Sequence, residues 1–312
     1  MKNMFLPSSP RRTNRSASHI LLGGVIVSLL LTARPVTAQF SFDFNGGNDP
    51  GWTHYAPAGL GQTFSFPANP IGVGNLAYQI TSAAGSGANP GRVGSFRMGD
   101  PQIPDFIVTT DLLNWNNASS QNIGVMARVQ SPLPGLTFPL GYALTYANRF
   151  SATGSGTDQL RLYKIVSGNV GFMNTTTGGP SQTNGNLGQF GVVPGGSAAP
   201  NPTNDYELVF TGKGNVFTGQ IIDKSTGLAL TFNDGFGGLT DKIVASDPGV
   251  AGGFGALYNT GTYGVFGFVG SGAIDPTFDN FTAIPEPSTW AIAGLGLLGF
   301  FALNARRMKR SV

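Results

Sequence analysis

Residues 123–129 read Ile-Gly-Val-Met-Ala-Arg-Val, and residues 160–166 read Leu-Arg-Leu-Tyr-Lys-Ile-Val. A third stretch, residues 206–210, reads Tyr-Glu-Leu-Val-Phe. In each stretch apolar side chains recur at every second position, which places them on one face of an extended chain. The pattern predicts half-buried antiparallel strands, and no segment between residues 39 and 284 shows the stripe of an amphipathic helix.

Further strands are expected along the rest of the chain. Residues 223–227, Asp-Lys-Ser-Thr-Gly, separate two apolar segments at 216–222 and 228–232, and Gly227 supplies the positive φ of a hairpin turn. Other strands are predicted at residues 40–44, 76–80, 106–112, 142–146, 253–258, 264–269 and 277–283. More than ten short strands with Gly-rich connections favour an all-β sandwich of two antiparallel sheets.

Composition constrains how this fold is stabilised. The chain has 47 Gly among 312 residues and no Cys, so disulfides and thiolate metal sites contribute nothing. Residues 174–204 are rich in Thr, Gly, Ser, Asn and Pro, which predicts a long loop insertion in the sandwich. This insertion is interpreted as a surface loop, with a mobile lid as the alternative.

The N-terminal 38 residues have the three parts of a signal peptide. Basic residues precede an apolar segment at 20–31, and Val-Thr-Ala occupies positions 36–38. Signal peptidase is expected to cleave after Ala38, which makes Gln39 the first residue of the exported protein. The arginine pair at positions 11 and 12 raises the twin-arginine route, but no apolar pair follows it, so the general secretory route is favoured.

The C-terminus holds a second targeting segment. Pro285, Glu286 and Pro287 precede an apolar run at residues 290–303, and a basic tail follows that includes Arg306 and Arg307. A helix over residues 288–305 would be about 27 Å long, against roughly 30 Å of hydrocarbon core. The cations favour the cytoplasmic side, so the triplet would face the periplasm. The segment is either a sorting signal that is removed or a permanent transmembrane anchor.

The triplet, the short Gly/Leu/Ala/Phe helix and the terminal Arg/Lys cluster together resemble the PEP-CTERM sorting signal of Gram-negative bacteria that make exopolysaccharide. The resemblance implies that a membrane protease, exosortase, recognises the triplet and removes the helix and tail. It predicts an inner-membrane intermediate and then a protein at the cell surface or in the extracellular matrix. The expected domains are a signal peptide (1–38), an ectodomain (39–284) and the sorting signal (285–312).

Removing these end segments reverses the net charge. Nine of the 18 cations and one of the 15 carboxylates lie within them, so residues 39–284 carry a net charge of −5. No basic stripe is left to neutralise phosphates, which argues against nucleic-acid binding.

The body of the chain has a second resemblance. Phe42-Asp43-Phe44 followed by Trp52, the hairpin series at 206–232, and Thr277-Phe-Asp-Asn-Phe281 together resemble the concanavalin A-like jelly roll of lectins and glucanases. The resemblance covers most of residues 40–284. It implies that the first and last strands pair, and that a structural Ca²⁺ ion binds where they meet, with Asp43 and Asp279 as candidate ligands.

The sequence argues against the usual enzymes of this fold. Glycoside hydrolysis normally needs two carboxyl groups about 5 to 9.5 Å apart. Glu207 is the only glutamate between residues 39 and 284, so the paired-Glu motif of jelly-roll glucanases is absent. His54 is the only histidine in the same range, which excludes multi-histidine metal sites. The alternative is an atypical sugar-active enzyme that uses aspartates, with Asp100, Asp105 and Asp111 as candidates.

Carbohydrate binding needs exposed aromatic rings and nearby amides or hydroxyls. Trp115, in Asn114-Trp-Asn-Asn117 beyond a predicted strand end, is expected to be exposed, and Trp52 and Tyr55 are the other candidates. The predicted function is that of an exosortase-sorted surface or matrix protein that binds polysaccharide or acts structurally, without catalysis. Ice binding is a third reading, but the chain has no regular Thr-x-Thr repeat.

Overall fold

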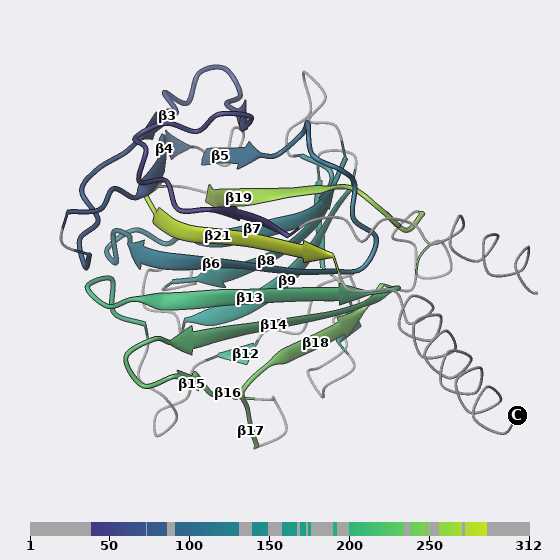
Figure 1. The fold of residues 1–312 in the computed structure, drawn as a ribbon. Helices are drawn as coiled ribbons and strands as arrows, with labels where there is room; N and C mark the ends of the chain where they lie inside the picture. Colours follow the sequence, from purple (N-terminus) through teal and green to yellow (C-terminus); the bar gives the residue numbers. More distant parts are fainter. Residues whose placement is uncertain are drawn as a thin grey trace, which may run out of the picture. The chain divides into compact units, whose positions relative to one another are not determined.

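The computed structural model describes residues 39–72, 74–85, 91–130, 139–148, 158–166, 169–172, 174–175, 190–191, 200–233, 238–247, 249, 256–269 and 272–285. These residues form 21 β-strands and no α-helix, so none of them belongs to a helix that is long and apolar enough to cross a membrane. The strands build two stacked antiparallel sheets (Figure 1). The predicted all-β jelly-roll sandwich is confirmed, while the predicted signal peptide and membrane helix lie outside the described residues.

Sheet A has 11 strands. Its main path runs in the order β11, β18, β14, β13, β6, β21, β4 and β20, with β1 paired to β21, β15 to β14 and β3 to β4. The bounds are β11 Asn174–Thr175, β18 Ile243–Ser246, β14 Val216–Asp223, β13 Tyr206–Lys213, β6 Phe106–Asn114, β21 Thr277–Pro285, β4 Tyr78–Gly85, β20 Gly272–Ile274, β1 Phe40–Phe42, β15 Leu228–Ala229 and β3 Thr63–Ser65.

Sheet B has eight strands in the order β10, β9, β8, β7, β19, β5 and β2, with β12 paired to β9. The bounds are β10 Asn169–Phe172, β9 Gln159–Val166, β8 Gly141–Ala147, β7 Asn122–Val129, β19 Thr262–Val269, β5 Gly91–Phe96, β2 Thr53–Tyr55 and β12 Phe190–Gly191. A separate hairpin joins β16 (Phe232–Asn233) to β17 (Leu239–Thr240).

The core fills the space between the two sheets. Along β13, Tyr206, Leu208 and Phe210 are buried while the residues between them are half-buried, as the alternation predicts. Gly219 on β14 marks how closely the sheets approach, because a Cβ atom there would lie 2.2 Å from Leu144 Cδ1 on β8. A larger residue at this position would require the Leu144 side chain to move, so glycine suits the close packing here.

The first and last strands of the sandwich pair, as the jelly-roll resemblance implies. β1 runs antiparallel to β21, with Phe40 opposite Ala283 and Phe42 opposite Phe281. Trp52 packs edge-on against Phe281 with 5.2 Å between the ring centroids. This aromatic contact fixes both ends of the described chain at one place in the fold.

The predicted hairpin at residues 223–227 is also confirmed. Asp223 pairs with Leu228, and Gly227 has a φ of 71°, the left-handed conformation that favours glycine. Asp223 Oδ1 accepts hydrogen bonds from the backbone N–H and the hydroxyl of Ser225 at 2.8 and 2.6 Å. The turn is therefore held by its own side chains.

Two predicted strands differ from the structure. The strand expected at 228–232 is divided between β15 and β16, because the chain leaves β14 after Leu230 and pairs elsewhere. Residues 256–258, the described part of the strand expected at 253–258, are not a strand. Their backbone groups bond to side chains instead: Tyr258 N donates to Tyr142 Oη, and the Tyr258 carbonyl accepts from Arg128.

Candidate functional site

Three acidic side chains lie in one row across adjacent strands of sheet A. Glu207 on β13 pairs in register with Asp111 on β6, and Asp111 pairs with Asp279 on β21. Residues in the same register on neighbouring strands point to the same face of a sheet. That face is the outer one, because the neighbours of Glu207 along β13 point into the core. We call Glu207, Asp111 and Asp279 the carboxylate row.

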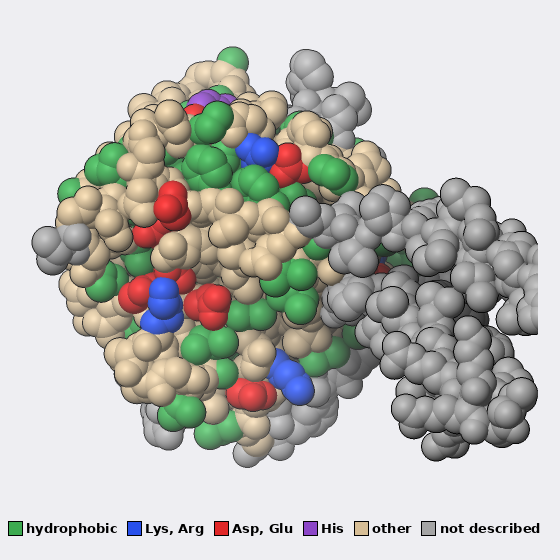
Figure 2. Space-filling model, in the orientation of Figure 1, with side chains coloured by type: hydrophobic (Ala, Val, Ile, Leu, Met, Phe, Trp, Pro, Cys, Tyr) green, Lys and Arg blue, Asp and Glu red, His purple; other side chains and the backbone are tan. Residues whose placement is uncertain are grey.

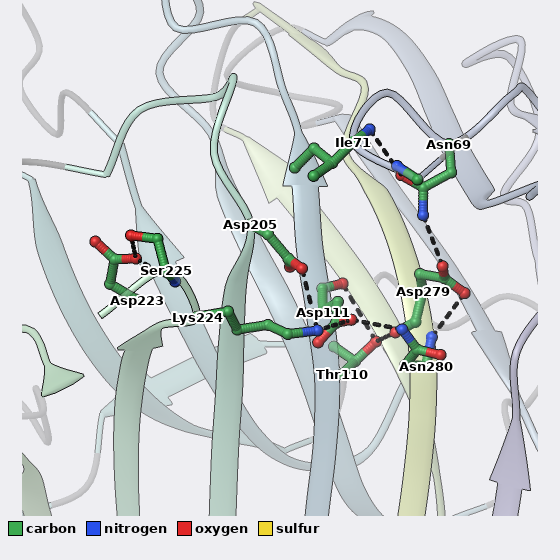
Figure 3. A network of polar contacts seen from close by, with 11 residues as sticks. Asn69, Ile71, Thr110, Asp111, Asp205, Asp223, Lys224, Ser225, Asp279 and Asn280 are labelled. Atoms are coloured by element: carbon green, nitrogen blue, oxygen red, sulfur yellow. Dashed lines mark hydrogen bonds and ion pairs between the residues drawn. The ribbon is translucent and has the colours of Figure 1, made fainter. Parts of the chain in front are cut away.

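A lysine contacts the middle member of the carboxylate row. Lys224, in the turn after β14, places Nζ 2.6 Å from Asp111 Oδ2 and 3.1 Å from Asp205 Oδ2 (Figure 3). Figure 2 shows acidic side chains gathered around a basic one over the left-hand ends of β6, β13 and β14. Asp205 Oδ1 is buried and has no hydrogen-bond partner in the structure.

Two asparagines complete the patch. A β-bulge in β21 places Asn280 at a φ of 47° and directs its Nδ2 to Asp111 Oδ2 at 2.7 Å. Asn69 donates from Nδ2 to Asp279 Oδ2 at 2.8 Å, while its Oδ1 accepts from the backbone N–H of Ile71 and of Gly72. The loop around Asn69 is thus anchored on the carboxylate row (Figure 3).

Burial raises the pKa of three carboxyl groups in this patch. The pKa of Asp279 rises to about 6, mainly because of burial and further because of the charges of Asp111 and Asp43. Burial and the charge of Asp111 also raise the pKa of Glu207 and of Asp205. Near pH 6 the patch therefore offers both protonated and ionised carboxyl groups, which can donate and accept hydrogen bonds.

The predicted calcium ligands are close enough to interact, but Asp279 is already engaged. Asp43 is exposed, and its Oδ1 accepts from Asn45 N at 3.2 Å. The two oxygens of Asp279 accept from Asn280 N and from Asn69 Nδ2, both at 2.8 Å. Among the described residues no three His, Cys, Asp or Glu side chains are grouped to hold a metal. Amide N–H groups cannot ligate a cation, so these donors do not fit Ca²⁺, and its binding stays a prediction.

The predicted exposure of Trp115 is wrong. Its side chain is buried and packs edge-on against Tyr146 at 5.5 Å, while Nε1 donates to Asn117 Oδ1. Trp52 and Tyr55 are buried as well, each with less than a tenth of its surface exposed. All three aromatic side chains pack in the core although polar residues flank them in the sequence. None of the three rings therefore offers a free face to a sugar.

The structure separates the three aspartates of the enzymatic alternative. Asp111 belongs to the carboxylate row, whereas Asp100 forms a bidentate pair with Arg97 and accepts from Tyr263. Asp105 accepts from Gly214 N at 2.9 Å and lies 3.5 Å from an Arg128 nitrogen. Asp100 and Asp105 therefore have structural partners, and Asp111 alone among them has acidic neighbours on adjacent strands.

The processing residues fall at the limits of the described chain. Gln39 is exposed immediately before β1, and Pro285 is the last residue of β21, opposite Phe106 of β6. Ala38, Glu286, Pro287, Arg306 and Arg307 lie outside the described residues. The predicted N-terminal cleavage site thus lies directly before the first strand of the sandwich, and the predicted C-terminal site lies at the end of the last strand.

A family model confirms the C-terminal resemblance. The PEP-CTERM protein-sorting motif matches residues 283–307, which include the triplet, the apolar run and part of the basic tail. The chain carries this sorting motif, which marks exported proteins. No curated protein sequence matches the chain.

Several solved structures have a similar fold. One is lectin II from Ulex europaeus, with 10% sequence identity, a TM-score of 0.44, and coverage of 80% of this chain and 98% of that one. A second is the carbohydrate-binding module CBM66 from Bacillus subtilis, with 14% identity, a TM-score of 0.41, and coverage of 76% and 97%. A third is a Bacillus subtilis protein of unknown function with a galectin-like fold, with 11% identity, a TM-score of 0.44, and coverage of 80% and 97%.

Proposed function

We propose that this chain is a non-enzymatic protein that exosortase sorts to the cell surface or exopolysaccharide matrix. The observation that carries the proposal is the position of the sorting motif relative to the last strand. The motif begins at residue 283, and β21 ends at Pro285. Every described strand of the sandwich therefore lies on the N-terminal side of Glu286, so cleavage at the triplet removes none of them.

Mass spectrometry of the extracellular protein tests this sorting. We expect a C-terminus close to residue 285 in the wild type, and an uncleaved, membrane-bound chain when Pro285, Glu286 and Pro287 are all replaced by Ala. A strain without exosortase should give the same uncleaved product. An extracellular protein that still carries the basic tail would contradict the proposal.

The carboxylate row is our candidate for polysaccharide binding at that location. It combines the half-buried Glu207 and the 37% exposed Lys224 with the buried carboxylates of Asp111 and Asp279 beneath them, a mixture of acceptors and donors that suits a ligand rich in hydroxyl groups.

A panel of immobilised polysaccharides tests this binding. We expect retention without release of reducing sugar, and at least a tenfold weaker affinity for Asp111→Asn, because about 1.4 kcal/mol corresponds to a factor of ten. Gln220→Ala is the matched control, because Gln220 lies on β14 of the same sheet, outside the carboxylate row. Equal retention of both variants would exclude the row as the binding site.

The register of the carboxylate row also favours a second candidate, an atypical sugar-active enzyme. Directly opposed residues on adjacent strands have Cβ atoms about 4.5–5.5 Å apart, close to the separation of roughly 5–5.5 Å between the carboxyl groups of retaining glycosidases. Glu207 and Asp111 form such a pair. Reducing-sugar release that disappears in Glu207→Gln would favour the enzyme over the binding protein.

A further inference from the structure

A lysine and an aspartate meet in the interior of the sandwich, away from the carboxylate row. Lys164 on β9 of sheet B and Asp247, which follows β18 of sheet A, place Nζ and Oδ2 2.6 Å apart. Both side chains have no exposure to solvent. The pair therefore joins the two sheets at a position that water does not reach.

The groups around this pair orient both partners. Tyr142 donates its hydroxyl to Asp247 Oδ2 at 2.6 Å, and Gly249 N donates to Asp247 Oδ1 at 2.8 Å. Lys164 Nζ also donates to the carbonyl of Ala256 at 3.1 Å. The amine, the two carboxylate oxygens and their donors are thus held in one fixed arrangement.

Keeping Lys164 and Asp247 charged in these buried surroundings costs free energy. Lys164 Nζ lies 5.8 Å from the ring centroid of Tyr142 and 5.4 Å from that of Tyr258. A second buried cation, Arg128, lies 5.9 Å from the Tyr142 ring and shares this environment. An ion pair in a dry interior carries a large desolvation penalty, whereas an amide in its place carries no net charge.

We propose that Lys164 and Asp247 condense to form an intramolecular isopeptide bond between the two sheets. A proton passes from Nζ to the carboxylate, and the neutral amine attacks the Asp247 carboxyl carbon. A bond forms between Nζ and Cγ, the bond between Cγ and Oδ2 breaks, and one water molecule leaves. No oxidant, reductant or other reactant is needed.

The donors around Asp247 match the demands of this step. Negative charge develops on Oδ1 in the tetrahedral intermediate, where Gly249 N–H stabilises it as an oxyanion-hole donor does. Oδ2 departs as water, and the Tyr142 hydroxyl polarises it. Burial raises the pKa of Tyr142, and the hydrogen bond to Asp247 raises it further, so this hydroxyl stays protonated as a donor.

The chain supplies its own control pair. Lys224 and Asp111 are also 2.6 Å apart, but the Lys224 side chain is 37% exposed. Water solvates that ammonium group and keeps it charged, so we expect no bond there. A cross-link between sheets also suits a chain without cysteine, which cannot use disulfides outside the cell.

Tryptic peptide mapping of the denatured full-length protein, with mass spectrometry, tests the proposal. Trypsin does not cleave after an acylated lysine, so we expect cleavage after Lys224 and none after Lys164. The uncut fragment should contain Asp247 in a branched peptide whose mass is lower by one water molecule. Cleavage after Lys164, or a fragment that carries added mass instead, would overturn the proposal.

Three variants sharpen the result. Lys164→Arg keeps the charge but should restore the unbranched peptides and the full sequence mass. Tyr142→Phe should slow bond formation at least tenfold after refolding of freshly made protein, while Lys224→Arg should leave the bond unchanged. The wild-type measurement needs no variant to fold, so a branched peptide absent from mature wild-type protein is decisive against the bond.

Discussion

Two lysine–aspartate pairs in this sandwich have the same separation and different surroundings. Nζ and Oδ2 are 2.6 Å apart in Lys164–Asp247 and in Lys224–Asp111. The first pair is closed between the sheets, whereas the second lies on the outer face of sheet A with its lysine 37% exposed. The comparison teaches that solvent access, rather than distance, decides what such a pair contributes to stability and to chemistry.

The largest effect is expected from removing the buried carboxylate. Asp247→Ala removes the proposed bond and leaves Lys164 charged and buried without its partner, so the free energy of unfolding should fall by at least about 3–5 kcal/mol. Asp111→Ala should cost less than Asp247→Ala, because Lys224 is 37% exposed and keeps Asp205 as a partner. Urea unfolding followed by fluorescence measures both values, and equal losses would contradict the comparison.

A smaller effect is expected in the coupling energy of each pair. A double-mutant cycle with Lys164→Met and Asp247→Ala should give a coupling above roughly 2 kcal/mol, because each single variant loses both the contact and the proposed bond. The same cycle with Lys224→Met and Asp111→Ala should give a smaller coupling, because water reaches Lys224 and Asp205 remains as its second partner. If the coupling energy of Lys224 and Asp111 were as large as that of Lys164 and Asp247, water would have less access to Lys224 than its exposed fraction indicates.

The pH dependence of stability should distinguish the outer patch, which contains Asp279, from the interior pair of Lys164 and Asp247. The pKa of Asp279 is about 6 in the folded protein against an ordinary value of 3.8, so the folded state binds this proton more tightly. The contribution of Asp279 to stability should therefore increase as the pH falls from about 6 to about 4, and decrease as the pH rises through the same window. Melting temperatures across this range should depend less on pH in Asp279→Asn, and an unchanged slope would count against the shift.

The smallest effect is expected from salt. Raising the ionic strength from about 0.05 to about 0.5 M should reduce the coupling of Lys224 and Asp111 by a few tenths of a kcal/mol, because exposed charges are screened. The buried pair should keep its coupling. Repeating both double-mutant cycles at the two salt concentrations provides the measurement, and a salt-sensitive interior pair would indicate that water enters.

Most of the fold could be predicted because alternation reports which face of a strand is buried. The pattern at residues 160–166 identified β9, and its parity also places Lys164 on the face of Leu160 and Leu162. A lysine at an inward position signals a buried counter-charge, but the sequence does not indicate which aspartate supplies it. β5 was missed because Gly91, Arg92 and Gly94 interrupt the alternation in a strand whose residues are all buried.

The candidate site was less predictable because it depends on register. Parity places Asp111 and Glu207 on the outer faces of their strands, but only the pairing of β6, β13 and β21 makes them neighbours of Asp279. Asn280 reaches Asp111 through a bulge that no alternation pattern reveals. Trp115 was expected at the surface because asparagines flank it, and its packing against Tyr146 arises from a contact between distant segments.

The position of Pro285 at the end of β21 has a mechanical consequence. β21 pairs with β6 from Thr277 to Pro285 and with β1 through Phe281, Thr282 and Ala283. Tension applied at the C-terminal end of β21 pulls along the strand axis, so the hydrogen bonds on both sides share the force in shear instead of opening one after another. Drag from flowing liquid on a sandwich tethered there would therefore load the hydrogen bonds of β21 in shear.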